Sequence, residues 1–277
     1  MKISNYHMHC DYCDGIGEPR TYVEEAIRKG FKIIGFSSHA PIPFDSTWTM
    51  KEENVIHYLD AIGKLKIEYK DRIEIYTGFE IDYFGGDSRD IFNKYDVDYQ
   101  IGSVHFFSDH INNTYYSVDG NDEDFKRTLN EYFDGNIEDL VCSYYEQLIK
   151  MIEQHQPDIL GHLDVVKKNN GDERYFSEQE EWYITQVHKL LDVIKQHGTI
   201  VEVNTGGITR GYIKEPYPSK WILKECKKKG IDVMVNSDAH SVEFIDGYFD
   251  LAFSYLKEVG YSEVMVLQNG KWDRVKI

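Results

Sequence analysis

Segments typical of β-strands alternate with segments typical of α-helices along almost the whole chain, and this alternation restricts the possible folds most. The strand candidates are short runs rich in β-branched and aromatic residues, and the helix candidates carry apolar residues three and four positions apart. Strands that alternate with helices pair in parallel through right-handed crossovers. Seven such units favour a closed or nearly closed barrel over an open doubly wound sheet. The expected strands cover residues 2–9, 32–39, 73–82, 97–106, 158–165, 199–205 and 232–240.

Turn signals mark several ends of the expected helices. Gly30 and Gly230 each follow a helical pattern at the position where a helix commonly ends. The C-terminal tail is typical of a short hairpin that turns at Asn269-Gly270. Because the chain has no linker, low-complexity tract or fixed-period repeat, we expect residues 1–277 to form one α/β domain. The expected helices cover residues 20–29, 52–69, 87–95, a stretch that ends near 155, 178–197, 219–229 and 247–258.

Histidine and carboxylate residues gather where the expected strands end. In a β/α barrel, the carboxyl ends of the strands and the loops that follow them form the functional face. Six of the 11 histidines fall at five strand ends, whereas the other five lie on helical patterns or in a polar stretch. One such histidine alone is more often a hydrogen-bonded core residue, but many together on one rim would be costly to bury without a cation. The rim residues are His7, His9, Asp14, His39, Glu80, Asp82, His105, His162, Asp164, Asn204, Asp238 and His240.

The spacing of the rim residues predicts shared metal ions. Residues two apart on a strand point to the same side, so His7 and His9 can reach one ion, and Asp238 and His240 share a side in the same way. Neutral imidazole and carboxylate together suit Zn, Mn or Fe rather than Ca or Mg alone. There are more candidates than one tetrahedral ion needs. We therefore expect two or three divalent metal ions and the chemistry of a multinuclear hydrolase.

The same segments resemble the ordered motifs of the polymerase-and-histidinol-phosphatase (PHP) superfamily. They are H-M-H followed by D-Y-C-D-G, then S-S-H-A, G-F-E-I-D, G-S-V-H, G-H-L-D, E-V-N-T and N-S-D-A-H, in the expected order from residue 7 to residue 240. The chain length and the E-V-N-T…R…Y-P-S arrangement over residues 202–219 are most similar to the histidinol-phosphate phosphatase branch. The resemblance implies a distorted seven-stranded (β/α)7 TIM-like barrel with a trinuclear metal centre.

The resemblance also implies how the ligands are shared among three ions. The ligands of the first ion would be His7, His9, Glu80 and Asp238. Glu80 would bridge to a second ion, whose other ligands would be His105 and His162. The third ion would be held by Asp14, His39 and His240. Asp14 stands where many relatives have a histidine, and this departure leaves the identity and occupancy of the third ion open.

The activity that the resemblance implies is hydrolysis of L-histidinol phosphate to L-histidinol and phosphate in histidine biosynthesis. A hydroxide held between the metals would attack phosphorus, because coordination brings the pKa of water towards ~7. Glu80, Asp238 and His240 are the catalytic candidates. The proton for the leaving alkoxide would come from Asp238 or from a metal-bound water.

Basic and aromatic side chains near the rim are the candidates for substrate binding. Arg210, six residues after Asn204, is the first candidate for the phosphate, and Lys167 or Lys168 is the second. A solvated loop cation is the competing explanation for each. Trp48 lies in a proline-stiffened loop that would either form a wall over the metals or pack against the barrel. The expected substrate contacts are Arg210, Lys167, Lys168, Asn204 and Trp48.

Composition restricts the partners. With 48 acidic against 31 basic residues, the net charge is −17, which disfavours binding to nucleic-acid backbones. The sequence has neither a long apolar run nor a secretory-signal pattern. Four cysteines are too few for a disulfide scaffold, and the lone Cys10-x-x-Cys13 pair lacks the second pair of a zinc ribbon. We therefore expect a cytoplasmic protein with a small-molecule substrate, without nucleic-acid or membrane partners; the oligomeric state stays open.

Two other functions compete with the phosphomonoesterase. One is a phosphodiesterase, exonuclease or phosphatase of the same superfamily that acts on nucleotides or another small phosphate ester. The acidic net charge and the lack of an appended basic domain count against it. The other is a catalytically silent metal-binding barrel, and the full set of ligand types counts against that.

Overall fold

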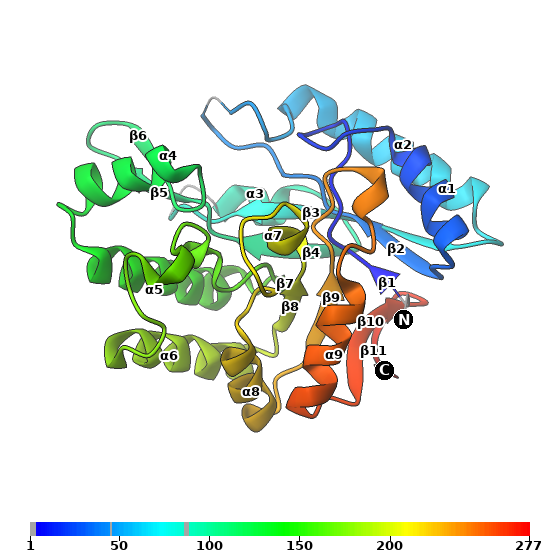
Figure 1. Ribbon diagram of the computed structural model, residues 1–277. Helices are drawn as coiled ribbons and strands as arrows, with labels where there is room; N and C mark the ends of the chain where they lie inside the picture. The colour runs from blue at the N-terminus through cyan, green and yellow to red at the C-terminus, as the bar shows by residue number, and fades with distance from the viewer. Residues whose placement is uncertain (1–3, 45, 86–88) are drawn as a thin grey trace.

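The centre of the structure is a sheet of seven parallel strands in the order β1-β2-β3-β4-β7-β8-β9 (Figure 1). This structure is a computed structural model that describes residues 4–44, 46–85 and 89–277. Beyond the two edge strands the chain closes the ring, because the His9 amide donates to the Ala239 carbonyl at 2.9 Å. The expected nearly closed barrel is therefore confirmed. The strands are β1 (Ser4–Asn5), β2 (Ile33–Phe36), β3 (Glu74–Asp82), β4 (Tyr99–Ser103), β7 (Ile159–Leu160), β8 (Ile200–Asn204) and β9 (Val233–Asn236).

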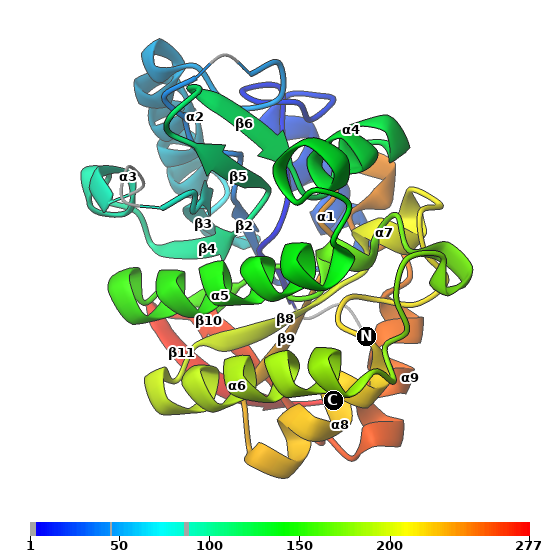
Figure 2. The same ribbon diagram turned by 90° about the vertical axis from the view of Figure 1, so that its left-hand side faces the viewer.

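Helices follow the strands and cover the outside of the sheet (Figures 1 and 2). They are α1 (Pro19–Lys29), α2 (Val55–Glu68), α3 (Arg89–Lys94), α5 (Ile137–His155), α6 (Glu181–His197), α8 (Lys220–Lys229) and α9 (Phe249–Val259). Gly30 and Gly230 end α1 and α8 with φ of 87° and 64°, as the sequence predicts. Residues 2–3 of the first expected strand and 87–88 of the third expected helix lie outside the described residues. No helix in the described part of the chain is long and apolar enough to cross a membrane.

Tyr99 fills the middle of the barrel below the strand ends. It starts β4, is 1% exposed, and donates its hydroxyl to the backbone carbonyl of Tyr6 on the opposite side. The neighbouring strands have glycine where this ring crosses: a Cβ on Gly35 would lie 2.5 Å from the Tyr99 Oη, and one on Gly78 would lie 2.6 Å from its Cζ. Such approaches are too close for any side chain. The filled centre confines open space to the carboxyl ends of the strands.

The expected C-terminal hairpin is present and lies at the opposite end of the barrel. It consists of β10 (Glu263–Gln268) and β11 (Lys271–Lys276), and its turn has positive φ at Asn269 and Gly270, as the Asn-Gly pair predicts. The amide of Asn269 donates to Glu74 at the start of β3 at 2.8 Å, and the Tyr6 hydroxyl donates to the Leu267 carbonyl at 2.7 Å. The hairpin therefore covers the amino ends of the strands.

Additional elements surround the carboxyl ends. The acidic, Asn-rich stretch after β4 forms an antiparallel hairpin that the sequence did not predict, and Phe106, expected to end a barrel strand, begins it. This hairpin and the short helix after it cover one side of the barrel mouth in Figure 2. A single helical turn also follows β8. These elements are β5 (Phe106–Asp109), β6 (Thr114–Ser117), α4 (Asp122–Arg127), a π-helical turn (Thr128–Tyr132) and α7 (Gly206–Thr209).

Candidate metal centre

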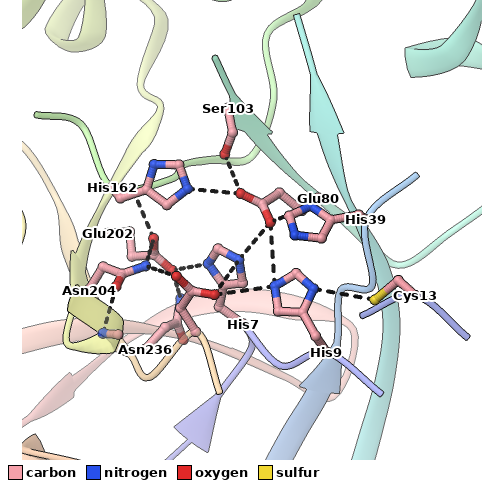
Figure 3. A network of polar contacts seen from close by, with 12 residues as sticks. His7, His9, Cys13, His39, Glu80, Ser103, His162, Glu202, Asn204 and Asn236 are labelled. Carbon is pink, nitrogen blue, oxygen red and sulfur yellow. Dashed lines mark hydrogen bonds and ion pairs between the residues drawn. The ribbon is translucent and has the colours of Figure 1, made fainter. Parts of the chain in front are cut away.

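Side chains from six strand ends converge at the carboxyl end of the barrel, as the sequence predicts. Figure 3 shows five of them, His7, His9, His39, Glu80 and His162. Parallel strands bring their carboxyl ends to the same edge, so residues far apart in the chain meet there. Seven of the nine ligand candidates are buried, whereas Asp14 and His240 lie at the outer edge. The nine are His7, His9, Asp14, His39, Glu80, His105, His162, Asp238 and His240.

The Glu80 carboxylate lies between two groups of histidines. Its Oε2 is 3.1 Å from His7 Nε2 and 3.4 Å from His9 Nε2. Its Oε1 is 2.9 Å from His162 Nε2 and 3.6 Å from His105 Nε2. Because each oxygen faces a different pair, one carboxylate can serve two ions at once. This geometry is the one that the predicted bridging role requires.

A third group lies at the outer edge of the centre. Asp14 Oδ1 is 3.4 Å from His240 Nε2 and 3.9 Å from His39 Nε2. The His9 ring lies between these two histidines, with ring centroids 4.1 Å from His240 and 4.2 Å from His39. Asp14 is therefore close enough to act with both histidines, although it comes from a loop rather than from a strand end.

The donor atoms fit divalent metal ions. His9 Nε2 and His39 Nδ1 are buried and make no hydrogen bond within the described residues, although Asp238 Oδ1 lies 3.3 Å from the first and Glu80 Oε2 lies 3.0 Å from the second. Buried polar atoms normally have a partner, and a cation shared by imidazoles and carboxylates would supply it. The ligand atoms form four overlapping groups, each within 4.8 Å: His9, Asp14, His39 and His240; His7, His9 and Glu80; Glu80, His105 and His162; and His39, Asp82 and His105.

Buried carboxylates orient two of the histidines from behind. His7 Nδ1 is 2.7 Å from Glu202 Oε1, and His105 Nδ1 is 2.7 Å from Asp82 Oδ1. Such outer contacts fix the tautomer and the ring orientation of metal-binding histidines. Glu202 also accepts a hydrogen bond from Asn236 Nδ2 at 2.9 Å. The sequence analysis assigned no role to Glu202 or Asn236.

Burial and neighbouring charges set the protonation of the centre. Burial disfavours the ionised form of Glu80, but His7, His39 and His162 together outweigh it and hold the pKa of this carboxyl well below its usual range. Burial also opposes ionisation of Asp238, but Arg210, together with the neighbouring histidines, holds the pKa of Asp238 well below its usual range. Burial lowers the pKa of His9 to about 4, so its imidazole is neutral. Ionised carboxylates and neutral imidazole are the forms that bind metal ions, so Glu80, Asp238 and His9 are already in those forms. At His7 and His105 neighbouring carboxylates outweigh burial and raise the pKa, so an ion bound there would displace a proton.

Comparison with known proteins agrees with this geometry. The family model of the PHP domain matches residues 5–206. The chain belongs to the PHP domain family. A histidinol-phosphatase of Bacillus subtilis is 30% identical over 273 residues, which cover 91% of this chain and 98% of that protein. A histidinol-phosphatase of Lactococcus lactis is 24% identical over 285 residues, covering 100% and 98% of the two chains.

Solved structures support the fold. The crystal structure of the Lactococcus lactis histidinol phosphate phosphatase, in complex with Zn, L-histidinol and phosphate, superposes with a TM-score of 0.75. The match covers 98% of this chain and 99% of that chain, at 22% sequence identity. This chain thus shares its fold with that protein.

A cavity of about 590 Å³ opens beside the ligand candidates. Its volume suits a small molecule. Seven of the nine ligand candidates, all except His7 and His9, line it, and the rest of its lining combines aromatic, basic and acidic side chains. The wall residues outside the ligand set include Trp48, Phe106, Tyr115, Tyr116, Asp119, Asp124, Arg127, Lys168, Arg210 and Tyr212.

Three of the five expected substrate contacts face this cavity. Arg210 Nη2 is 2.8 Å from Asp238 Oδ2, and its Nη1 is 2.8 Å from His240 Nδ1, so the guanidinium lies at the edge of the metal ligands. Lys168 Nζ lies 4.4 Å from the centroid of the Tyr212 ring. Trp48 packs edge-on against the His39 ring at 4.5 Å. Their contact with a substrate stays a prediction.

The other two expected contacts lie behind the cavity wall. Lys167 is 7% exposed and forms ion pairs with Asp164 at 2.8 Å and with Glu215 at 3.4 Å. Asn204 is fully buried, and its Nδ2 donates to Glu202 at 2.9 Å. Both side chains are occupied by protein partners, so they hold parts of the wall in place rather than line it.

Proposed function

We propose that this chain is a metal-dependent phosphomonoesterase that hydrolyses L-histidinol phosphate to L-histidinol and phosphate. The observation that carries the proposal is the Glu80 carboxylate, which lines a small cavity and whose two oxygens face two pairs of histidines. The full-length similarity to a histidinol-phosphatase of Bacillus subtilis supports the choice of substrate. Histidine biosynthesis is the pathway that this activity would serve.

The proposed cofactor is a set of two or three divalent ions, Zn, Mn or Fe. When bound, such ions activate water near neutral pH and neutralise charge on a phosphate. Glu80 would hold two ions together, and the buried Glu202 and Asp82 would keep the rings of His7 and His105 in place. Asp14, His39 and His240 would form the third site at the edge of the centre.

The chain's own side chains would bind the phosphate and move the proton. Arg210 lies beside Asp238 and His240 and would donate charge-assisted hydrogen bonds to the phosphate, and Lys168, which lines the same cavity, is the second candidate. Asp238, ionised and held by Arg210, would accept the proton of the attacking water and return it to the leaving alkoxide.

Chelation tests the proposal directly. We expect purified protein to release phosphate from L-histidinol phosphate, to lose this activity in excess chelator, and to regain it with Mn, Zn or Fe. A metal-replete sample that releases no phosphate but shortens oligonucleotides from their 3′ ends would instead favour the exonuclease function. Metal binding without hydrolysis of any of a few dozen phosphate esters would favour the silent barrel.

Asp119 is our candidate for binding the ammonium group of the substrate. It lines the cavity, its charge helps to raise the pKa of His105, and it pairs with Lys168 Nζ at 3.7 Å. A charge-assisted hydrogen bond is worth ~1.5–3 kcal/mol, and ~1.4 kcal/mol is a factor of ten. Asp119→Asn should therefore lower kcat/KM for L-histidinol phosphate about 10- to 100-fold.

An ester without an amine distinguishes this role from a general one. Hydrolysis of p-nitrophenyl phosphate by Asp119→Asn should change less than about threefold, because that substrate makes no ammonium contact. Asp124→Asn is the matched control. Asp124 lines the same cavity, but its side chain caps α4 by accepting a hydrogen bond from the backbone N–H of Asn121 at 3.2 Å. Equal losses on both esters would remove Asp119 from the ammonium site.

We also infer that residues 1–277 form one PHP-type barrel domain. We infer further that it works in the reducing cytoplasm, and that its substrate is a small molecule rather than a nucleic acid. Asp238 and His240, beyond the matched region, would complete the metal centre, since Asp238 lies 3.3 Å from His9 Nε2 and His240 lies near Asp14; β9 completes the ring of strands. All four cysteines are free thiols, as a reducing compartment requires. The net charge of −17 opposes binding of nucleic acid.

A further inference from the structure

The two nitrogens of the His9 ring have very different surroundings. Nε2 points into the metal centre, whereas Nδ1 points away from it towards the thiol of Cys13, 3.5 Å away (Figure 3). At the corresponding outer positions, His7 contacts Glu202 and His105 contacts Asp82. His9 therefore has a thiol where these two histidines have carboxylates.

The hydrogen-bond directions around Cys13 form a consistent chain. Cys13 Sγ lies 3.6 Å from the carbonyl oxygen of Cys10, which can only accept, so the thiol donates its proton there. The sulfur is then free to accept from the Nδ1–H of His9. This places the His9 proton on Nδ1 and leaves a lone pair on Nε2. Nε2 faces Glu80 and Asp238 and makes no hydrogen bond within the described residues.

The turn that carries Cys13 also carries a ligand candidate. The amide of Cys13 donates to the Cys10 carbonyl at 3.0 Å, which folds residues 10–13 back beneath His9. The next residue, Asp14, faces His240. Both cysteines are free, and the Cys10 thiol instead contacts the Ser38 hydroxyl at 3.3 Å. The C-x-x-C motif thus links the first strand end to the outer edge of the metal centre.

We propose that Cys13 is a positioning residue that holds His9 in the tautomer and orientation required to bind a metal ion through Nε2. The C-x-x-C motif then has neither a disulfide nor a zinc-ribbon role; it supplies a thiol acceptor behind a ligand. The inference rests on the proposed metal centre but not on the identity of the substrate.

Metal titration of Cys13 variants tests this role. Loss of the outer partner of a metal-binding histidine typically weakens metal binding or activity about 10- to 100-fold. We expect Cys13→Ala to weaken binding of one zinc ion by this factor in a chelator competition, and to lower kcat with KM changed less than about threefold. Cys13→Ser, whose hydroxyl can still accept and donate, should stay within about fivefold of the wild type in both measurements.

Cys142→Ala is the matched control, because Cys142 lies on α5 and contacts Gln186 outside the metal centre; its zinc affinity and kcat should equal those of the wild type. Unchanged zinc affinity in Cys13→Ala would overturn the proposal. So would an equal loss in Cys13→Ser and Cys13→Ala, because only a packing role predicts that serine fails to rescue. If the wild type binds zinc but hydrolyses no phosphate ester, the proposed function fails, while the titration still decides the role of Cys13.

Discussion

Glu80→Gln is expected to lower kcat/KM for L-histidinol phosphate about 1,000-fold and to remove two metal ions per chain at once. The amide keeps the size of the side chain but loses the negative charge that faces both histidine pairs. Loss of metal-based charge stabilisation amounts to several kcal/mol, and each ~1.4 kcal/mol is a factor of ten in rate. Elemental analysis of the purified variant measures the metal loss, and phosphate release measures the rate.

The opposite end of the same strand offers a matched control. Glu74 begins β3 and contacts the C-terminal hairpin through the Asn269 amide at 2.8 Å, away from the metal centre. Glu74→Gln should keep the metal content and the activity of the wild type. Full metal content in Glu80→Gln would contradict the bridging role, whatever happens to the activity.

Arg210→Ala is expected to lower kcat/KM about 10- to 100-fold, mainly through a raised KM, with unchanged metal content. The substitution removes the guanidinium, so the phosphate would lose its charge-assisted hydrogen bonds, each worth ~1.5–3 kcal/mol. A smaller fall in kcat should accompany the change, because Arg210 also holds the carboxylate of Asp238 at 2.8 Å. Steady-state kinetics together with elemental analysis separates these effects.

Two further variants sharpen this test. Arg210→Lys should recover only part of the activity, since a lysine cannot contact Asp238 and the phosphate with the planar fork of a guanidinium. Lys214 is a cation in the same loop, but its side chain is 91% exposed and pairs with Asp172. Lys214→Ala should therefore change neither kcat nor KM. An unaltered KM in Arg210→Ala would exclude Arg210 from the phosphate site.

Local patterns were sufficient for the barrel and for the residues at its rim, whereas the choice of nine ligand candidates among them came from the family resemblance. Strand and helix periodicity is a property of neighbouring residues, and the parallel arrangement it implies brings all strand ends to one edge. For this reason the Nε2 atoms of His105 and His162, which are 57 positions apart in the chain, lie 3.2 Å from each other. The hairpin after β4 escaped prediction because its Asn-rich turn and acidic flanks hid two short aromatic strands, Phe106–Asp109 and Thr114–Ser117.

The direction of individual side chains around the site was harder to predict. Glu202 precedes Asn204 by two positions on β8, so the strand period already put both on the inner face; that signal was present in the sequence but was not used. Lys167 and Lys168 carried no such signal. Consecutive residues at a tight helical turn point about 120° apart, and their surroundings differ: Lys167 is buried among carboxylates, whereas Lys168 lines the cavity.

The sequence by itself determined the alternating barrel and the residues that gather at its rim, because both follow from short-range periodicity and from the common edge of parallel strands. Only the tertiary structure decided which atoms face one another. It placed the two oxygens of Glu80 between separate histidine pairs, Arg210 against Asp238, and the thiol of Cys13 behind His9. The physical reason is that such contacts depend on side-chain rotamers and on packing between segments distant in the chain, which no local pattern encodes.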